Sequence, residues 1–350
     1  MKRFYNSIQL ANCILILTFS FLHQISTAQI IKSQQEEITF KNNSITLAGT
    51  LSLPQNKGQH PVIVFIHGDG PEDRTGCGYY NEIWNEFNKI GIACFAWDKP
   101  GVGKSSGIFK DYQSYEERAS EVIYAIEALK KRKDIDSNTI GLWGISQAGW
   151  IMPMVYGQEK IYSIIAISCP SRTVSDASAY ATKQDLIAKK VKEIQIDSAM
   201  KIFYDVIQLI TSKSSYQDYI EFKNKTISTW PIISPFSILQ MNEDEYNRLV
   251  STQIPSIDAA PMLKKIKCPV LAIWGDKDKN VPPELSLNDY NTLMKDNKNL
   301  TTIMMSNADH LIFQSSGNSK EIKSNSVKLP YAEGYLQKMS EWLKEIKMSN

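Results

Sequence analysis

The sequence predicts an α/β protein, with a mostly parallel central sheet and helices on both of its faces. Short, dense apolar runs alternate along the chain with segments of helical period. These runs are apolar at nearly every position, which is typical of strands that are buried on both faces. Residues 140–150 combine such a run with a turn of small residues and the start of a helix. This regular alternation favours a sheet that is covered by helices on both sides.

The chain has 350 residues, 43% of them hydrophobic, and a formal net charge of +2. This near balance of charge gives no reason to expect nucleic acid or an anionic membrane as a partner. The length suits one large domain with an insertion, or two domains. The sequence does not indicate an oligomeric state.

Residues 1–28 are predicted to be a secretory signal peptide. Lys2 and Arg3 form a basic start, 13–22 is an apolar run, and Ala28 completes a cleavage site of small residues. An uncleaved membrane anchor is the alternative, but the run is short for a span of about 20 residues. We therefore expect cleavage after Ala28, a secreted or periplasmic protein, and no stable membrane insertion after cleavage.

The strands and helices in the first part of the mature chain are predicted from the spacing of apolar residues and from turn signals. Residues 36–53 are predicted to form a β-hairpin, because apolar positions alternate on both sides of the turn at 42–44. The further predicted elements are strands at 62–66, 92–97, 140–145 and 161–168, and helices at 79–89, 114–133 and from the serine turn to 157.

The alternation stops after Pro170. Residues 175–249 have a helical pattern without a strong strand, so we predict an inserted helical cap. Its lysines are mixed with acidic and apolar residues, which favours a solvated helical face over a surface for an anionic partner. Strands are predicted again at 269–275 and 300–305, with a closing helix at 331–346. The predicted organisation is a signal peptide at 1–28, core at 29–170, cap at 171–260 and core at 261–350.

Ser146 is a candidate nucleophile because Gly144 and Ala148 flank it. A serine on a strained strand-to-helix turn needs small neighbours, since strand and helix nearly touch there. Such a turn exposes the hydroxyl above a helix N-terminus, whose free N–H groups bind developing negative charge. The alternative is a solvated serine in an ordinary turn, because this short pattern is common by chance.

A serine nucleophile needs a base, and His310 is the best candidate. His23 is lost with the signal peptide, His60 precedes a strand, and His67 lies in a His-Gly turn. His310 follows the last predicted strand, and sites in open α/β sheets form beyond the carboxyl ends of strands.

The base in turn needs an orienting carboxylate. The loop after the preceding strand, 275–282, offers two, Asp276 and Asp278. The chain order serine, acid, histidine is that of an α/β-hydrolase.

Four motifs, each after a predicted strand, resemble the α/β-hydrolase superfamily and, more narrowly, its bacterial esterase and dienelactone-hydrolase-like group. The group's patterns are H-G-S-G-P-x-D-R, D-x-R-G-x-G-x-S, a serine turn and G-x-x-D-x-x-V-P, which match residues 67–74, 98–105, 144–149 and 275–282. Two departures concern substrate preference more than chemistry: Asp69 replaces a serine, and Pro100 stands where arginine is common.

The resemblance implies an α/β-hydrolase fold and a serine hydrolase that cleaves small-molecule carboxylic esters without a metal or cofactor. Ser146 would attack the acyl carbon, His310 would move the proton, and Asp278 would orient the imidazole. Asp276 stands directly after the strand end, where we expect it to bond the backbone of the turn. A peptidase or amidase of the same fold and a catalytically inactive binding protein are the alternatives.

The same resemblance implies an oxyanion hole made by the backbone N–H groups of Gln147 and Asp69. A carboxylate beside an oxyanion is unfavourable. We therefore expect the Asp69 side chain to point away from it, toward Arg74.

Two other features do not indicate sites. Residues 101–105 resemble the end of a phosphate-binding loop, but Asp98 stands where the full pattern needs glycine. Four cysteines follow the signal peptide without the spacing of metal ligands, and we expect mostly free, buried thiols.

Overall fold

A computed structural model of the chain describes residues 34–230, 236–315 and 330–348. All of these residues belong to one compact unit, which spans 33–350. The predicted signal peptide, 1–28, lies outside the described residues.

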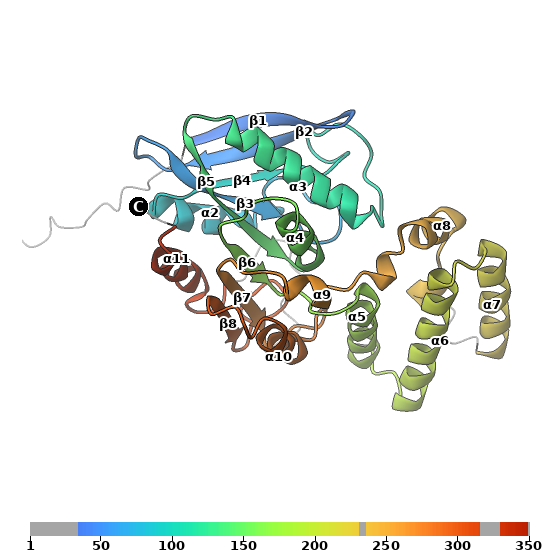
Figure 1. The fold of residues 1–350 in the computed structure, drawn as a ribbon. Helices are drawn as coiled ribbons and strands as arrows, with labels where there is room; N and C mark the ends of the chain where they lie inside the picture. The colour runs from blue at the N-terminus through green and yellow to red at the C-terminus, as the bar shows by residue number, and fades with distance from the viewer. Residues whose placement is uncertain (1–33, 231–235, 316–329, 349–350) are drawn as a thin grey trace, which may run out of the picture. The chain divides into compact units, whose positions relative to one another are not determined.

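An eight-stranded sheet organises the fold, with the strand order β1-β2-β4-β3-β5-β6-β7-β8 (Figure 1). β1 and β2 form the predicted antiparallel hairpin, and β2 is antiparallel to β4, whereas all further neighbours are parallel. The sheet is therefore mostly parallel, as predicted. The strands are β1 (Gln34–Asn42), β2 (Ile45–Leu53), β3 (His60–Ile66), β4 (Ala93–Trp97), β5 (Ile135–Ile145), β6 (Ile164–Ile167), β7 (Val270–Gly275) and β8 (Leu300–Met305).

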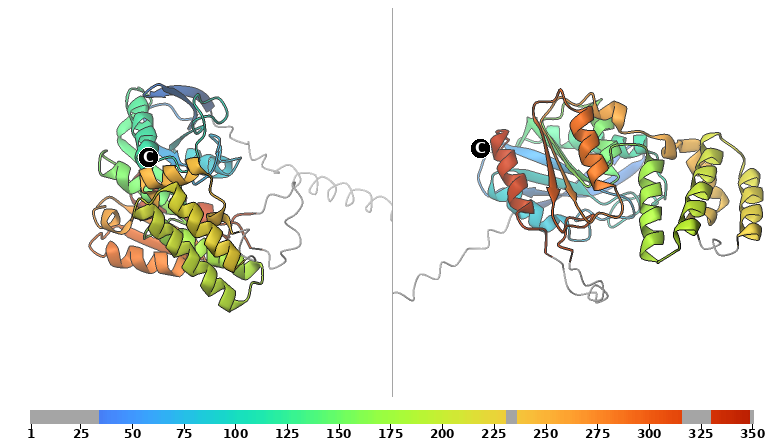
Figure 2. Two further views of the ribbon diagram at one scale, coloured as in Figure 1. Left: turned by 90° about the vertical axis from the view of Figure 1, so that its right-hand side faces the viewer. Right: turned by 90° about the horizontal axis from the view of Figure 1, so that it is seen from below.

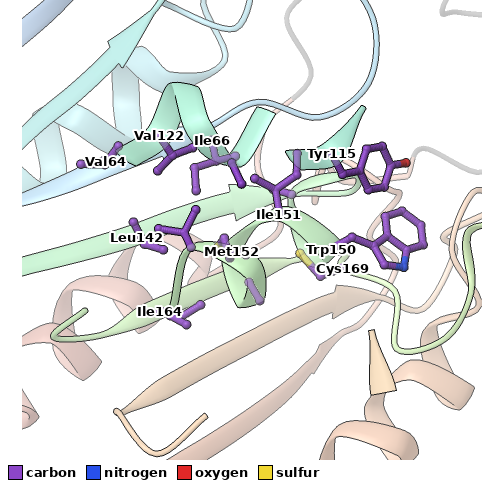
Figure 3. Packing of buried hydrophobic residues seen from close by; sticks show 14 of the residues in the cluster. Val64, Ile66, Tyr115, Val122, Leu142, Trp150, Ile151, Met152, Ile164 and Cys169 are labelled. Carbon is purple, nitrogen blue, oxygen red and sulfur yellow. The ribbon is translucent and has the colours of Figure 1, made fainter. Parts of the chain in front are cut away.

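Helices cover both faces of the sheet. α2 (Tyr80–Lys89) and α11 (Tyr335–Glu345) pack on one face, where they share a buried cluster with Phe65 of β3. α3 (Tyr115–Lys130), α4 (Ala148–Tyr156) and α10 (Pro283–Leu293) contribute to the cluster on the other face. Figure 3 shows this second cluster, where Val64 and Ile66 of β3 lie near Val122 of α3 and Ile151 of α4. Alternate residues of one strand therefore point to opposite faces of the sheet and pack into the two different clusters.

The boundaries of some elements differ from the prediction. β6 occupies only Ile164–Ile167 of the predicted 161–168, and β5 begins at Ile135, earlier than expected. α10 (Pro283–Leu293) was not predicted from the sequence. This helix buries only Pro283, Ser286 and Tyr290, so its sequence lacks the apolar stripe that indicates an amphipathic helix.

The chain between β6 and β7 is helical, and the described part of this segment contains no strand of the sheet. Side-chain caps define where three of its helices begin: Thr173, Ser215 and Asn242 each accept a bond from the backbone N–H three residues later. Figure 2 shows the helices grouped together. They are α5 (Val174–Ala188), α6 (Glu193–Thr211), α7 (Tyr216–Thr229) and α8 (Glu243–Thr252), whereas the short α9 (Ala260–Leu263) lies beside α4 and α10.

Within the ranges that the structure describes, none of the helices combines the length and apolar character needed to cross a membrane.

Candidate active site

Ser146 lies on a strained turn between β5 and α4. Its φ of 56° falls in the left-handed region, which serine rarely adopts. A Cβ on Gly144 would lie 2.5 Å from the Cβ of Ala148, and one on Gly149 would lie 2.8 Å from the Cβ of Cys169. The turn therefore needs the small residues that the sequence places there, and it tolerates alanine at 148 because residue 144 is glycine.

Two backbone N–H groups next to this serine are free to bind an anion. Gln147 is the N-cap of α4, and Gly68 lies so close that a Cβ on it would be 3.6 Å from the Ser146 Cβ. In the described part of the chain, neither the N–H of Gln147 nor that of Asp69 donates a hydrogen bond to a protein group. Unpaired N–H groups around a serine are the feature from which an oxyanion hole is built.

The expected approach of the Asp69 side chain to Arg74 is wrong. Its Oδ1 accepts a bond of 3.0 Å from the Gln147 side-chain Nε2, and it does not pair with Arg74. The Arg74 guanidinium is held instead by the buried Asp98, with 2.7 Å between Nη2 and Oδ2, and by Glu37. The guanidinium of Arg74 binds the buried carboxylate of Asp98 more strongly than it would bind the exposed carboxylate of Asp69.

The structure brings Asp278 and His310 together. Nδ1 of His310 lies 2.8 Å from Oδ2 of Asp278, whose side chain is buried. The other carboxylate oxygen, Oδ1, accepts the backbone N–H groups of Asn280 at 2.7 Å and Val281 at 3.0 Å. One oxygen thus anchors the loop while the other faces the imidazole.

A close crossing of two loops produces this pair. A Cβ on Gly275 would lie 2.3 Å from the carbonyl oxygen of Ala308, so only glycine allows the contact. The N–H of Lys277 donates to that same carbonyl at 2.9 Å, and the N–H of Asp276 donates to Met305 at 3.0 Å. The loop after β7 is therefore joined to the loop that carries His310.

Asp276 does not bond the backbone of the turn after β7, contrary to the prediction from the sequence. Within the described ranges, its carboxylate approaches only the Nζ of Lys277, at 3.5 Å. Asp278 bonds the backbone of the loop instead. Its Oδ1 accepts the N–H groups of Asn280 and Val281, two and three residues later, and this closes an Asx-type turn.

The two other histidines in the described part of the chain, His60 and His67, are placed as predicted. His60 is the first residue of β3, at the end of the strand opposite to the loops of the site. His67 is fully buried, with Nδ1 2.8 Å from the hydroxyl of Tyr80 and Nε2 2.6 Å from the carbonyl of Trp97. Both ring nitrogens of His67 are therefore occupied in holding its turn.

Ser146, Gln147 and Asp69 line a cavity of about 430 Å³. Its walls come mainly from the helical segment between β6 and β7 and are mostly apolar, with Trp150, Phe203, Ile207, Ile210, Met241, Leu249 and Val281 among them. His310 is not part of this lining, and no hydrogen bond joins it to the Ser146 hydroxyl among the described residues. Such bonds are often long before substrate binds.

Tyr180 makes a contact with the acid loop, 275–282, that was not predicted from the sequence. From α5, its hydroxyl donates to the backbone carbonyl of Asp278 at 3.0 Å. This bond ties the helical segment to the acid loop. No sequence signal distinguishes Tyr180 from other tyrosines of the segment, because the contact joins positions that are 98 residues apart.

The phosphate-loop resemblance of 101–105 has a structural explanation. The N–H of Lys104 donates to Oδ2 of Asp98 at 2.8 Å, and a Cβ on Gly103 would lie 2.3 Å from that oxygen. The protein's own carboxylate therefore occupies the place of a phosphate.

The described residues contain no cluster of three or more His, Cys, Asp or Glu side chains that could hold a metal ion. The four cysteines in this part of the chain are free thiols, as expected. Cys94 and Cys169 are buried, but Cys77 is exposed.

A family model described as serine aminopeptidase, S33, matches residues 58–314. Two curated relatives are similar over most of the chain. The uncharacterized 31.7 kDa protein in the traX-finO intergenic region of Escherichia coli is 24% identical, over 75% of this chain and 88% of that protein. Esterase EstD of Thermotoga maritima is 20% identical, over 81% of this chain and 63% of that enzyme.

Solved structures show the same fold at low identity. Est1E from Butyrivibrio proteoclasticus, solved with ferulic acid bound, has a TM-score of 0.53 at 17% identity, covering 89% of this chain and 98% of that one. The Pyrococcus furiosus esterase Pf2001 has a TM-score of 0.55 at 17% identity, covering 90% and 91%. Together with the sheet order, these similarities confirm the predicted α/β-hydrolase fold.

Proposed function

Because this chain belongs to the serine aminopeptidase S33 family of α/β-hydrolases, we propose that it hydrolyses carboxylic esters through Ser146. The observation that carries the proposal is the position of this serine. Ser146 is on a left-handed turn and lines an apolar cavity, beside two N–H groups that have no protein partner among the described residues.

In the proposed reaction, the Ser146 Oγ attacks the acyl carbon and its proton passes to Nε2 of His310. The N–H groups of Gln147 and Asp69 bind the resulting oxyanion. The tetrahedral intermediate then expels the alcohol, which takes the proton from Nε2 and leaves an acyl-enzyme. A water molecule then attacks the acyl-enzyme, gives its proton to Nε2 of His310, and releases the carboxylic acid as Ser146 recovers its proton. Asp278 accepts a hydrogen bond from the Nδ1–H of the imidazole throughout.

A peptidase is the second candidate, and Asp69 favours it. This carboxylate is exposed at the cavity, where it is available to bind a substrate ammonium group. Rates on p-nitrophenyl esters of increasing chain length, measured beside peptide nitroanilides, decide between the two bond types. A fluorophosphonate probe tests for a catalytically inactive binding protein, which would form no adduct at Ser146.

We also propose export, on the basis of the signal-like sequence of residues 1–28. N-terminal sequencing of the protein recovered from outside the cytoplasm should begin at Gln29. A protein that retains Met1 and stays in the cytoplasm would contradict this proposal.

The helical segment is proposed to act as a cap that sets substrate size. Ile207 of α6 lines the cavity, so Ile207→Trp should fill part of it and lower kcat/KM for long-chain more than for short-chain p-nitrophenyl esters. The matched control is Ile194→Trp on the same helix, because Ile194 is 71% exposed. An unchanged chain-length profile in the Ile207 variant would mean that this wall does not limit the substrate.

A further inference from the structure

We propose that Lys99 is a positioning residue that strengthens the oxyanion-binding N–H of Asp69. The inference rests on the proposed ester hydrolysis and assigns a role to a buried side chain that the mechanism above does not use. Lys99 follows directly on β4 and Asp98, and it is only 2% exposed.

The Lys99 ammonium group binds the backbone of the loop after β3. Its Nζ donates to the carbonyl of Gly68 at 2.6 Å and to the carbonyl of Gly70 at 2.5 Å. Its backbone N–H donates to the carbonyl of Glu72 at 3.2 Å. Three bonds from one residue therefore fix the loop that presents Asp69 to the site.

The first of these bonds has an electrostatic consequence. The carbonyl of Gly68 and the N–H of Asp69 belong to one peptide group, which is planar and trans, so the two dipole ends point in opposite directions. A cation on the carbonyl side keeps the N–H directed away from Lys99. It also polarises the peptide, which makes the N–H a stronger donor.

Among the described residues, no carboxylate pairs directly with the ammonium group of Lys99. Asp69 and Glu72 face it from the loop, and Arg118 and Glu121 face it from α3. Glu72 lies 3.1 Å from Nδ1 of His67, and Glu121 lies 3.4 Å from Arg118, so both acids already have partners. The carbonyl groups of the loop are thus the groups that receive this charge most directly.

Burial, followed by the nearby Arg118, lowers the pKa of Lys99 to about 7, although Glu72, Asp69 and Glu121 oppose this shift. The side chain is cationic below this pH and neutral above it. Its effect on the oxyanion donor should therefore decline as the pH rises through about 7. The requirement for an unprotonated base acts in the opposite direction, on the acidic side of the profile.

The test compares Lys99→Met and Lys99→Gln with Lys104→Met. Lys104 lies in the same loop, but its Nζ is exposed and paired with Glu37 at 2.6 Å. Removal of a whole oxyanion donor costs about 10²–10³ in kcat, so its weakening should cost about 10-fold to 100-fold. We expect this loss for Lys99→Met on p-nitrophenyl acetate at pH 6, with KM little changed, and near wild-type values for Lys104→Met.

Lys99→Gln keeps a hydrogen-bond donor but removes the charge, so it separates loop position from polarisation. We expect an intermediate kcat. The wild-type kcat should fall above about pH 7, and this fall should be absent in both Lys99 variants. A purely structural role would change the melting temperature and leave the shape of the pH profile as it is.

Wild-type kcat at pH 6 in folded Lys99 variants would overturn the inference, even if Ser146 reacts with a fluorophosphonate. If neither variant folds, a wild-type kcat that stays level between pH 6 and 9, with circular dichroism unchanged, would overturn it equally. Failure of the proposed function is distinguishable, because it would appear as absent Ser146 labelling and absent turnover in the wild-type protein.

Discussion

Replacement of Ser146 by alanine is expected to abolish ester turnover while the protein remains folded. Ser146 lines the cavity, and the residue keeps its left-handed backbone only because β5 and α4 fix the turn. The N–H of Ser146 donates to the carbonyl of Ile167 at 3.0 Å, and alanine at this position keeps the same backbone donor. Loss of a serine nucleophile lowers kcat by about 10⁶ in a well-studied protease, so the residual rate should be close to background.

Ser168→Ala is the matched control for this experiment. Ser168 follows the neighbouring strand β6 and also has a positive φ, 47°, but its side chain is fully buried and its Oγ lacks a partner among the described residues. Its removal should leave both kcat and the thermal melt near wild type. Near wild-type activity of the Ser146 variant, measured on p-nitrophenyl acetate, would refute the nucleophile assignment.

The sequence was most informative where single strands are completely buried. β3 and β7 are apolar at nearly every position because helices cover both faces, so their runs are recognisable without an alignment. α10 was missed for the opposite reason. It starts at a proline pair and buries few side chains, so its pattern has no clear period.

Chain order and strand ends were enough to identify Ser146 and His310 as candidates, because both lie where a strand ends. The partner of Asp69 and the contact of Tyr180 were not predictable, since they depend on residues that are 78 and 98 positions away in the sequence. Lys99 had a usable signal. A lysine two residues after a strand that is buried throughout must either reach solvent or find buried acceptors.

The acid loop shows why local reasoning misplaced the turn contact. One carboxylate does two tasks: Asp278 closes the loop through Oδ1 and faces His310 through Oδ2. From the sequence, these two tasks were predicted to be divided between Asp276 and Asp278, because a residue directly after a strand is the usual place for a turn-bonding aspartate.

Asp278→Asn should therefore remove catalysis and largely preserve the loop. The amide oxygen of asparagine can keep the bonds from Asn280 and Val281, but its NH₂ would face Nδ1 of His310 and donate to it. The imidazole proton then moves to Nε2, the atom that must accept the proton of Ser146. In a well-studied triad, the same replacement lowers kcat by about 10⁴.

Asp276→Asn is the control within the same loop, since its half-exposed carboxylate approaches only Lys277 among the described residues. A surface change of this kind should alter stability by less than about 0.5 kcal/mol and leave kcat near wild type. Both variants are measured for kcat on p-nitrophenyl acetate and for melting temperature. A large loss of kcat in the Asp276 variant, with a near-normal kcat in the Asp278 variant, would reverse the assignment. Equal losses of kcat in both variants, with lowered melting temperatures, would mean that catalysis depends on the intact loop more than on either carboxylate. The close contact of Gly275 with Ala308 in this loop keeps Asp278 and His310 together.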